Sequence, residues 1–508
     1  MSSPSRFRLW RRLILAAIAV AWAGTAYWQS HKPMPEGTSL ASAWTVVPAD
    51  RVSFIADITG ADAYGRPIVS QAIFDEVLRV IRSAHHFIVL DYFLFNSWHG
   101  QVAGPSAPLR ALSSELRDAL IAQRQAHPDL RVLFITDPIN DVYGSDPSRD
   151  LKLLRGAGVD VVVTDLDRLR DSNPIYSGLW RLGIGWWDGG GGGPGWLPNP
   201  LDEDDRPITF GAWARLANFK ANHRKVIIAD DGEERLTGIV ASANPHDASS
   251  AHSNVATRVT GQVLLPLLQS EMSIARFSGW RGTLSLPESE SSAPAASTAN
   301  DAADLSAGRM ARVRVVTEGG ILRAILERLE SAGKGDNIDI AMFYLSSRAV
   351  IEALLEANRR GAAIRLILDP NKDAFGHQKA GIPNTSVASE LVSTSDGKIR
   401  VRWYRTHGEQ FHTKLVMVYG GQRLWLTLGS ANLTRRNLDD YNLEANLAIE
   451  VGRSSGLATQ LLDYFETLWS NRAALGIEYT ADFAVYAEPA QSQYWLYRLM
   501  EVSGLSTF

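Results

Sequence analysis

Two short motifs in the sequence combine side chains that can transfer protons and bind anions. His223 and Lys225 are two residues apart and directly precede an apolar run, Val226–Ala229; His412 and Lys414 also precede an apolar run. Residues two apart on a β-strand point to the same face, so each imidazole would lie beside an ammonium group. A single pair of this kind is most often a strand edge that meets solvent, but two matched pairs are hard to assign to chance.

Each pair is followed by a serine and an asparagine that are also two residues apart. They are Ser242 and Asn244 in the first case, and Ser430 and Asn432 in the second. We expect each set to form a hairpin, with His and Lys on one strand and Ser and Asn on its neighbour. Two such hairpins packed about a pseudo-two-fold axis would bring all eight side chains into one cleft.

The elements that must position these motifs also occur twice. Amphipathic helical patterns followed by apolar, strand-like runs occur at 73–96, 117–140, 321–347 and 351–372. The second pattern of each half ends in Asp-Pro, at Asp137-Pro138 and Asp369-Pro370. Helices that alternate with apolar strands are typical of α/β layers around a largely buried sheet.

We therefore predict an α/β fold with two similar half-domains, each a mixed sheet flanked by helices, that share one active site at a pseudo-two-fold interface. The half-domains are placed at 45–285 and 309–505. The stretch 286–308 is rich in Ser, Ala, Pro and acidic residues and is predicted to be a linker or surface loop, because it cannot bury enough apolar surface to order itself.

The bulk composition is that of a globular protein of two or three domains. The chain has 508 residues, 45% hydrophobic and 21% charged, with a formal net charge of −4. This slightly acidic balance argues against nucleic acid as a partner, because nucleic-acid binders are more often basic. The absence of cysteine excludes disulfides, thiolate metal sites and a cysteine nucleophile.

The N-terminal segment 1–30 is expected to be a signal-anchor or a signal peptide. Arginines precede the apolar run Leu13–Trp28, which is the inside-facing pattern, and Tyr27 and Trp28 suit the outer membrane interface. We favour an uncleaved anchor, with a cleaved signal peptide as the alternative. Either interpretation places the catalytic part outside the cytoplasm, in the periplasm or at the cell surface.

The doubled motif resembles the signature of the phospholipase D superfamily, which is His-x-Lys-x4-Asp followed by Gly-Ser-x-Asn, present twice. The resemblance covers most of residues 45–505. His223, Lys225 and Asp230 match the first copy, whereas Tyr419 replaces the aspartate of the second copy. Ala241 replaces the first glycine. The family aspartate is mainly structural, so these departures bear on local geometry more than on chemistry.

The residues suit phosphodiester chemistry on their own account as well. Lys225 and Lys414, with the amides of Asn244 and Asn432, can hold the non-bridging oxygens and stabilise a five-coordinate transition state. One imidazole can attack phosphorus and form a phosphohistidine, and the other can protonate the leaving group. We expect no cofactor and no metal, because the lysines supply the positive charge. Ser242 and Ser430 are assigned to substrate binding, and Asp230 to support.

In the resembled family an acidic residue downstream of each motif orients its histidine. Glu444 occupies that place for His412, and Asn254 occupies it for His223. A carboxylate favours the protonated imidazole, which suits an acid, whereas an amide orients the ring without raising its pKa. This reasoning, together with family precedent, predicts His223 as the nucleophile and His412 as the general acid.

The resemblance implies a phospholipase D-type phosphodiesterase or phosphatidyltransferase that acts on phospholipids, similar to bacterial cardiolipin-synthase-like members. Its expected partners are a phospholipid substrate and a membrane. One alternative is a nuclease of the same superfamily, which should have a basic groove and salt-sensitive binding. Another is a non-catalytic membrane-associated scaffold, which retention of both His-Lys pairs disfavours. The sequence leaves open whether water or an alcohol is the acceptor.

A tryptophan-rich segment at 175–200 surrounds a five-glycine run and has two interpretations. It is either a surface loop that packs onto the domain, or an interfacial loop in which Trp186 and Trp187 contact lipid headgroups. Isolated histidines such as His252 are expected to be at the surface or locally bonded.

Overall fold

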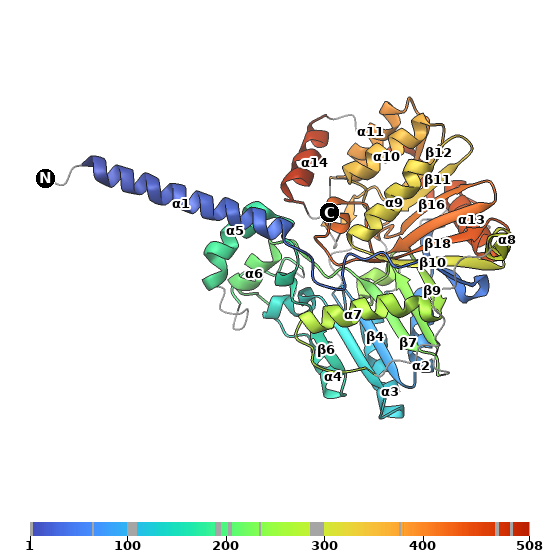
Figure 1. Ribbon diagram of the computed structural model, residues 1–508, viewed down its shortest axis with the longest axis horizontal. Helices are drawn as coiled ribbons and strands as arrows, with labels where there is room; N and C mark the ends of the chain where they lie inside the picture. Colours follow the sequence, from blue (N-terminus) through green and yellow to red (C-terminus); the bar gives the residue numbers. More distant parts are fainter. Residues whose placement is uncertain are drawn as a thin grey trace.

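The chain forms two β-sheets with helices packed on them (Figure 1). The computed structural model describes residues 4–506 with the exception of 63, 65, 99–108, 188–194, 202–205, 233–234, 285–298, 375–376, 379, 473–476 and 488–490. The five-glycine run and most of the predicted linker therefore lie outside the described residues.

The first sheet has the strand order β3-β2-β9-β8-β7-β4-β5-β6. Strand β5 is parallel to β4 and to β6, and all other neighbouring strands in this sheet are antiparallel. The bounds are β2 (Val52–Ala61), β3 (Pro67–Ser70), β4 (Phe87–Tyr92), β5 (Arg131–Thr136), β6 (Asp160–Val163), β7 (Lys225–Asp230), β8 (Leu236–Ala241) and β9 (Asn254–Thr260).

The second sheet has the order β1-β10-β18-β17-β16-β11-β12-β15-β19. Its parallel pairs are β11 with β12 and β12 with β15. The bounds are β1 (Thr45–Pro48), β10 (Met310–Thr317), β11 (Asn337–Met342), β12 (Ala363–Leu368), β15 (Ile399–Tyr404), β16 (Lys414–Gly420), β17 (Arg423–Gly429), β18 (Ala445–Gly452) and β19 (Thr480–Asp482). A short ladder, β13 (Asp373–Ala374) with β14 (His377–Gln378), stands apart.

The two sheets run in the same order through their central strands. The order β2-β9-β8-β7-β4-β5-β6 in the first sheet corresponds to β10-β18-β17-β16-β11-β12-β15 in the second, with the same parallel and antiparallel pairs. The predicted architecture of two mixed-sheet α/β halves is confirmed. In both halves the strand that begins with the motif lysine is central, so the motif lies inside the fold and not at a sheet edge.

Both faces of the first sheet are buried, which explains why its strands have continuous apolar runs. In β4, Ile88 and Leu90 pack with α2 (Ile73–Ser83), α3 (Leu112–Ala126) and α4 (Arg149–Gly156), whereas Phe87 and Val89 face a core shared with the second sheet. Successive side chains on a strand point to opposite faces, so both layers need apolar residues.

The second sheet is covered in the same way. Helices α9 (Gly319–Ser331), α10 (Arg348–Arg359) and α11 (Asn384–Thr394) pack on its outer face. Helices α7 (Leu265–Phe277) and α13 (Gly456–Trp469) contribute to the core that both sheets share. The two halves are thus joined through one continuous apolar core, which fixes the strand ends of one sheet relative to those of the other.

Two predicted boundaries need correction. Residues 45–48, predicted to open the first half, form β1 and pair with β10 of the second sheet. Within the predicted linker, residues 299–306 form a helix, α8 (Ala299–Ser306), and Leu305 is buried. The apolar side chain of Leu305 gives this stretch an anchor that its overall polar composition hides.

The remaining helices gather at one side of the molecule. Helix α1 (Pro4–His31) projects away from the sheets, and α5 (Pro174–Leu182), α6 (Phe210–Leu216) and α14 (Gln491–Ser503) lie near its base (Figure 1). Among the described residues, one helix is long and apolar enough to cross a membrane, at Phe7–His31. The short helix α12 (Arg435–Leu438) follows the second Ser-x-Asn motif.

Candidate active site

Each histidine of the doubled motif lies just before a central strand, and each lysine is the first residue of that strand. Lys225 begins β7 opposite Tyr92, and Lys414 begins β16 opposite Met342. The motifs therefore lie at the carboxyl ends of β4 and β11, which is where open α/β sheets carry their ligand sites. Each ammonium group donates to the carbonyl of its own histidine, at 2.8 Å for Lys225 and 3.0 Å for Lys414.

The main chains of the two halves meet beside these motifs. The His223 amide donates to the Leu443 carbonyl at 2.9 Å, and the Leu443 amide donates to the Ala221 carbonyl at 3.1 Å. On the other side, the Ser253 amide donates to the Gln410 carbonyl at 3.1 Å. The segment before each histidine is thus bonded to the segment that follows the Ser-x-Asn motif of the other half.

In this arrangement each histidine is bonded to an orienting residue of the other half, which corrects the sequence prediction. His223 Nδ1 lies 2.8 Å and 3.1 Å from the two carboxylate oxygens of Glu444, and His412 Nδ1 lies 3.1 Å from Asn254 Oδ1. The prediction paired Glu444 with His412 and Asn254 with His223, within each half. It was wrong because the bridge between Asn222 and Leu443 carries Glu444 across the interface.

Glu444 is held as a carboxylate by several donors. Besides His223, it accepts hydrogen bonds from the Ser430 hydroxyl and the Asn437 amide. Burial acts to raise the pKa of Glu444, but His223, Lys225 and the Ser430 hydroxyl outweigh it and lower that pKa. An ionised Glu444 requires the His223 proton to sit on Nδ1, which leaves Nε2 of that imidazole with a free lone pair.

Burial also shifts the pKa of the four motif side chains, in the direction of the neutral form. It lowers the pKa of His223 to about 4, against the opposing effect of Glu444, and it lowers the pKa of Lys225 to about 7. Burial together with the two lysines lowers the pKa of His412 well below its usual value, and the pKa of Lys414 is lowered in the same way. A bound phosphodiester anion would oppose each of these shifts.

The two serines have a different role from the predicted one. Ser242 donates to Asn254 Oδ1 at 2.9 Å and accepts from the Val255 amide at 2.9 Å. Ser430 likewise donates to Glu444 and accepts from the Ala445 amide at 3.0 Å. Both hydroxyls are buried and use their donor and acceptor, so they hold the residues that orient the histidines instead of binding substrate.

The two asparagines differ in their local bonding. Asn244 Oδ1 accepts from the Leu94 amide at 3.2 Å, whereas Asn432 Oδ1 is buried without a hydrogen-bond partner among the described residues. Both side chains are buried beside the motifs. The bond that Asn244 accepts leaves its NH₂ group available for an anion.

Comparison with known proteins finds a family match for part of the chain. Residues 325–469 match the family model described as "Cardiolipin synthase, PLD-like domain". Phosphatidylserine synthase of Haemophilus influenzae Rd KW20 aligns with 96% of this chain and 98% of its own, at 10% identity and a TM-score of 0.53, a likeness that shows the fold. The match over residues 325–469 and the shared fold support a place for the chain in the phospholipase D superfamily.

Two further solved structures align less well and carry no argument. Polyphosphate kinase from Porphyromonas gingivalis aligns over 89% of this chain and 53% of its own, at 14% identity and a TM-score of 0.44. A phospholipase D family member, Nuc from Salmonella typhimurium, aligns over 32% of this chain and 95% of its own, at 17% identity and a TM-score of 0.25. No curated protein sequence matches this chain.

Tyr419, which departs from the superfamily pattern, makes a hydrogen bond with a structural role similar to that of Asp230. Asp230 in the first half accepts the amides of His85, His86 and Phe87 at 2.9 to 3.0 Å and so holds the start of β4. In the second half the Tyr419 hydroxyl donates at 2.8 Å to Asp339, a residue of β11 that is also bonded to an arginine. Both sets of hydrogen bonds attach the end of the motif strand that is distant from the site to the neighbouring strand. Neither set contacts the site.

Sequence reasoning missed a pair of phenylalanines that flank the candidate site. The Phe93 ring lies 4.9 Å from the His223 ring, and the Lys225 ammonium lies 5.3 Å from the centre of the same phenyl ring. Phe343 stands 5.1 Å from His412, and its ring centre is 5.3 Å from the Lys414 ammonium. The available signal was that a phenylalanine directly follows the apolar run of β4 and that of β11.

The Asp-Pro repeats also have a role that the sequence did not reveal. Asp137 accepts the amide of Asn222 at 2.7 Å, and Asp369 accepts the amide of Phe411 at 2.7 Å. Asn222 and Phe411 are the residues before the two histidines. Each aspartate thus fixes the chain at the entry to a motif, and its repetition with Pro in both halves was the signal.

His252 is the isolated histidine that the structure brings to the second half-site. Its ring lies 6.0 Å from the His412 ring, and burial, with His246 and Lys414, lowers its pKa to about 3. The expectation that it is locally bonded holds, because its Nδ1 accepts from the Gln410 amide at 3.2 Å. Its closeness to His412 had no signal in the sequence.

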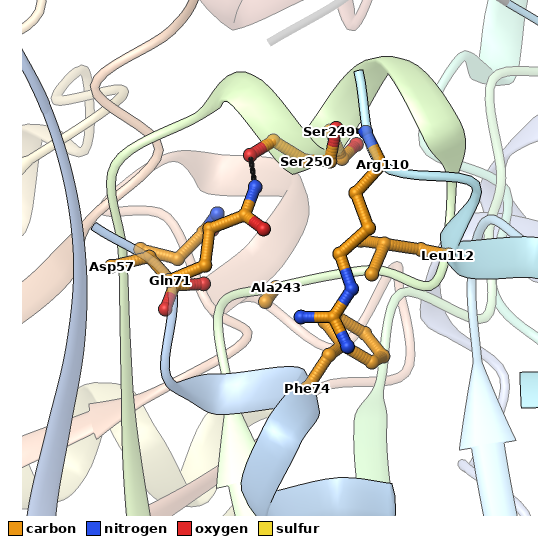
Figure 2. Close-up of a pocket in the computed structure, with 9 residues that line it drawn as sticks. Asp57, Gln71, Phe74, Arg110, Leu112, Ala243, Ser249 and Ser250 are labelled. Carbon is orange, nitrogen blue, oxygen red and sulfur yellow. Dashed lines mark hydrogen bonds between the residues drawn. The ribbon is translucent and has the colours of Figure 1, made fainter. Parts of the chain in front are cut away.

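Asn254 also lines a small pocket between α2, the start of α3 and the turn before β9 (Figure 2). The polar groups there are engaged with one another. The Gln71 amide donates to the Ser250 carbonyl, and the Arg110 guanidinium pairs with Asp75 and Glu115. These contacts hold the turn that leads into Asn254, so the pocket supports the position of that residue.

Metal-binding clusters were sought among the described residues. No group of three or more His, Cys, Asp or Glu side chains there could hold a metal ion. Positive charge near the motifs comes from Lys225 and Lys414, which lie within electrostatic reach of both histidines.

Proposed function

We propose that the protein is a phospholipase D-type phosphodiesterase or phosphatidyltransferase that acts on phospholipids through a covalent phosphohistidine. The observation that carries the proposal is the crossed pair of orienting contacts, Glu444 to His223 and Asn254 to His412. Each imidazole is presented by its own half and oriented by the other, so the reaction centre is complete only when both halves meet.

In the first step, Nε2 of His223 attacks phosphorus and the bond to the leaving alkoxide breaks. The new P–N bond gives the imidazole positive charge, which the Glu444 carboxylate stabilises through the Nδ1 proton. This argument replaces the sequence-based reason for choosing His223, because a carboxylate partner suits a ring that becomes cationic when phosphorylated. His412 delivers its proton to the departing oxygen.

In the second step, water or an alcohol attacks the same phosphorus and the P–N bond breaks. His412, now neutral, accepts the proton of the attacking hydroxyl and is restored to its acid form. Lys225 and Lys414 hold the non-bridging oxygens in both steps, with the amides of Asn244 and Asn432. Burial lowers the pKa values of His412 and the two lysines. These groups therefore depend on the negative charge of the bound substrate to favour their protonated forms.

The apolar helix α1 supports a membrane-anchored protein with its catalytic part outside the cytoplasm. Arginines at the start of the helix favour retention of that end on the cytoplasmic side of the membrane. A phospholipid is the phosphodiester that an anchored enzyme meets at highest local concentration, which favours lipid over nucleic acid as the substrate.

The test uses the full chain in mixed phospholipid vesicles, with and without added ethanol or glycerol, and mass spectrometry of the products. Phosphatidic acid would indicate hydrolysis, and a phosphatidyl-alcohol would indicate transfer. Neither product should form with His223→Ala. A parallel sample with single-stranded DNA serves as the alternative substrate; cleavage of DNA without any lipid product would contradict the proposal.

A covalent intermediate is tested with His412→Ala and a phosphodiester that carries a p-nitrophenol leaving group. Such a leaving group departs without an acid, so the phosphoryl group should accumulate on His223 and be found there by peptide mass spectrometry. An adduct on His412 in His223→Ala, with none on His223, would reverse the assigned roles.

A further inference from the structure

The C-terminal helix α14 carries an apolar outer face in addition to the face that packs on the protein. Trp495, Leu499 and Val502 are 66%, 66% and 73% exposed, and Leu496 is 48% exposed. Their spacing of three to four residues places them along one side of the helix. A contiguous exposed apolar stripe of this kind marks an interaction surface.

The inner face of α14 holds two loops of the second half. Glu501 accepts the Ser346 hydroxyl at 2.9 Å and the Arg435 amide at 3.1 Å. Tyr497 is fully buried, and its hydroxyl accepts from Arg348 at 3.2 Å. The helix is thus fastened by specific bonds and not only by apolar contact.

These two loops border the second half-site. Met500 of α14 packs against Phe343 and Tyr344, and the Phe343 ring lies 5.1 Å from the His412 ring. The Tyr344 carbonyl accepts from the amide of Leu433, the residue after Asn432, at 3.0 Å. A displacement of α14 would therefore change the surroundings of His412 and of Asn432.

The end of α14 meets α1 and α5 at one place, residues 171–173. The Asp171 amide donates to the Gln29 carbonyl near the end of α1 at 2.9 Å. Gly504, just after α14, lies so close to the Ser172 carbonyl that a Cβ atom on it would be 1.8 Å from that oxygen. Figure 1 accordingly shows α14, α5 and the base of α1 on the same side of the molecule.

The contact between α1 and α5 sets the depth of this place in a bilayer. The Trp22 indole donates to the Ile175 carbonyl at 3.0 Å. The part of α1 from Leu13, which follows the arginines, to Trp22 has about 10 residues and a length of about 15 Å, about half of the ~30 Å of a bilayer core. The start of α5 therefore lies in the outer half of the bilayer when α1 spans.

The exposed apolar side chains of neighbouring segments gather at the same side. They belong to α5, α6 and the stretches next to them: Ile175, Leu179, Trp186, Trp196, Phe210 and Trp213. Tryptophan and other large apolar residues are favoured at the headgroup layer. The predicted lipid contact of the tryptophan-rich segment stays a prediction, and the Trp187 side chain lies outside the described residues.

We infer that α14 is a membrane-docking helix whose outer face, Trp495, Leu496, Leu499 and Val502, enters the bilayer that α1 crosses. Because its inner face holds the loop of Phe343, which flanks His412, and the segment that follows Asn432, docking positions the second half-site at the lipid surface. The inference deepens the proposed function and rests on it for the substrate. Phospholipid, and not a second copy of the chain, covers this apolar face, because the end of α14 lies beside the base of the membrane-spanning helix α1.

The first test exploits the absence of cysteine from the chain. Val502→Cys in the full chain carries a spin label, and the protein is reconstituted in phosphatidylglycerol and phosphatidylethanolamine nanodiscs. Power-saturation measurements should find that oxygen relaxes the label more strongly than a water-soluble nickel complex. The matched control is Leu153→Cys on α4, where Leu153 is 41% exposed on a helix far from α1 and α14 (Figure 1).

The control label should be relaxed more strongly by the nickel complex, as expected for water. The same preference at position 502 would overturn the inference. A label at 502 that is shielded from both reagents, with spin–spin broadening that grows with protein content, would also overturn it, because a second chain would then cover the stripe.

The second test separates docking from chemistry. Leu499→Glu with Val502→Glu should lower turnover of vesicle phospholipid at least tenfold and leave hydrolysis of soluble bis(p-nitrophenyl) phosphate within twofold, while Leu153→Glu changes neither. Equal loss on both substrates, or no loss on either, would contradict the coupling of α14 to the lipid surface. If the unaltered protein cleaves neither substrate, the proposed function fails, and the spin-label result still decides whether α14 docks.

Discussion

The two half-sites share a scaffold and differ in charge. In both, a lysine donates to the carbonyl of its histidine, a phenylalanine flanks the ring, and an Asp-Pro aspartate holds the residue before it. The orienting partner differs, because His223 has the carboxylate of Glu444 and His412 has the neutral amide of Asn254. A symmetric frame thus presents two imidazoles in unequal electrostatic settings.

A second difference lies between each histidine and its lysine. In the first half this position is Arg224, which is fully buried and pairs with Glu271 at 2.9 Å and Glu318 at 2.6 Å. In the second half it is Thr413, whose hydroxyl lies 3.2 Å from the hydroxyl of Tyr464. Glu318 also accepts the Glu444 amide at 3.0 Å, so the ionic cluster behind the first motif supports the carboxylate that orients His223.

The matching sheets thus present two similar groups, and the interface between the halves makes those groups unequal. A nucleophile that becomes cationic benefits from a carboxylate, whereas an acid that must release its proton benefits from a neutral partner. Substitutions that remove or exchange the differing groups test this division of labour.

The largest effect is expected from the histidines themselves. His223→Ala should reduce kcat for a phospholipid by at least about 10⁴-fold, because it removes the proposed nucleophile. His412→Ala should lower kcat about 10²–10⁴-fold on the same substrate, but with a p-nitrophenyl ester it should still release a first burst of p-nitrophenol, because this leaving group needs no proton. Steady-state kinetics with the phospholipid and burst measurements with the ester decide the matter; loss of the burst in both variants would abolish the distinction.

The orienting residues come next. Glu444→Gln, which keeps shape and removes charge, should lower kcat by about 10²–10⁴-fold, by analogy with the loss of an orienting carboxylate behind a catalytic imidazole. Asn254→Asp should change kcat less than tenfold and raise the pKa of His412, seen by NMR of the ring. A pKa change at His223 instead, in Asn254→Asp, would contradict the crossed pairing.

The lysines predict a pH dependence. Burial lowers the pKa of Lys225 to about 7, so its ammonium is present below that pH and is lost as pH rises through it. kcat/KM should therefore fall on the alkaline side near pH 7. Lys225→Arg should move this fall to higher pH, because a guanidinium stays charged, whereas the exposed control Lys152→Arg should not. An unmoved alkaline limb would exclude Lys225 as its source.

The smallest effects are expected at the far ends of the motif strands, and they concern stability. Asp230→Ala leaves the amides of His85, His86 and Phe87 without this acceptor and should cost about 3 kcal/mol of unfolding free energy. Tyr419→Phe removes one hydrogen bond, to an aspartate that keeps its arginine, and should cost about 1 kcal/mol. Denaturant unfolding measures both. A loss of activity in folded Tyr419→Phe would give this tyrosine a role in the site.

The site residues and the α/β character could be predicted because both leave local marks in the sequence. His-x-Lys before an apolar run, Ser-x-Asn after it, and the return of both near residue 412 needed no knowledge of the fold. The pairing of β1 with the second sheet and the helix at Ala299–Ser306 could not be predicted, since each depends on contacts with residues distant in the chain.

The sequence by itself therefore determined which groups make up the candidate site: two imidazoles, two ammonium groups, two amides and one carboxylate. Only the tertiary structure decided which of them act together. Glu444 follows Ser430 by 14 residues, yet the carboxylate orients the histidine 221 residues away as well as accepting the Ser430 hydroxyl. Spacing along a strand sets which face a side chain occupies, but the partner across an interface is set by main-chain pairing and by the core that joins the two halves.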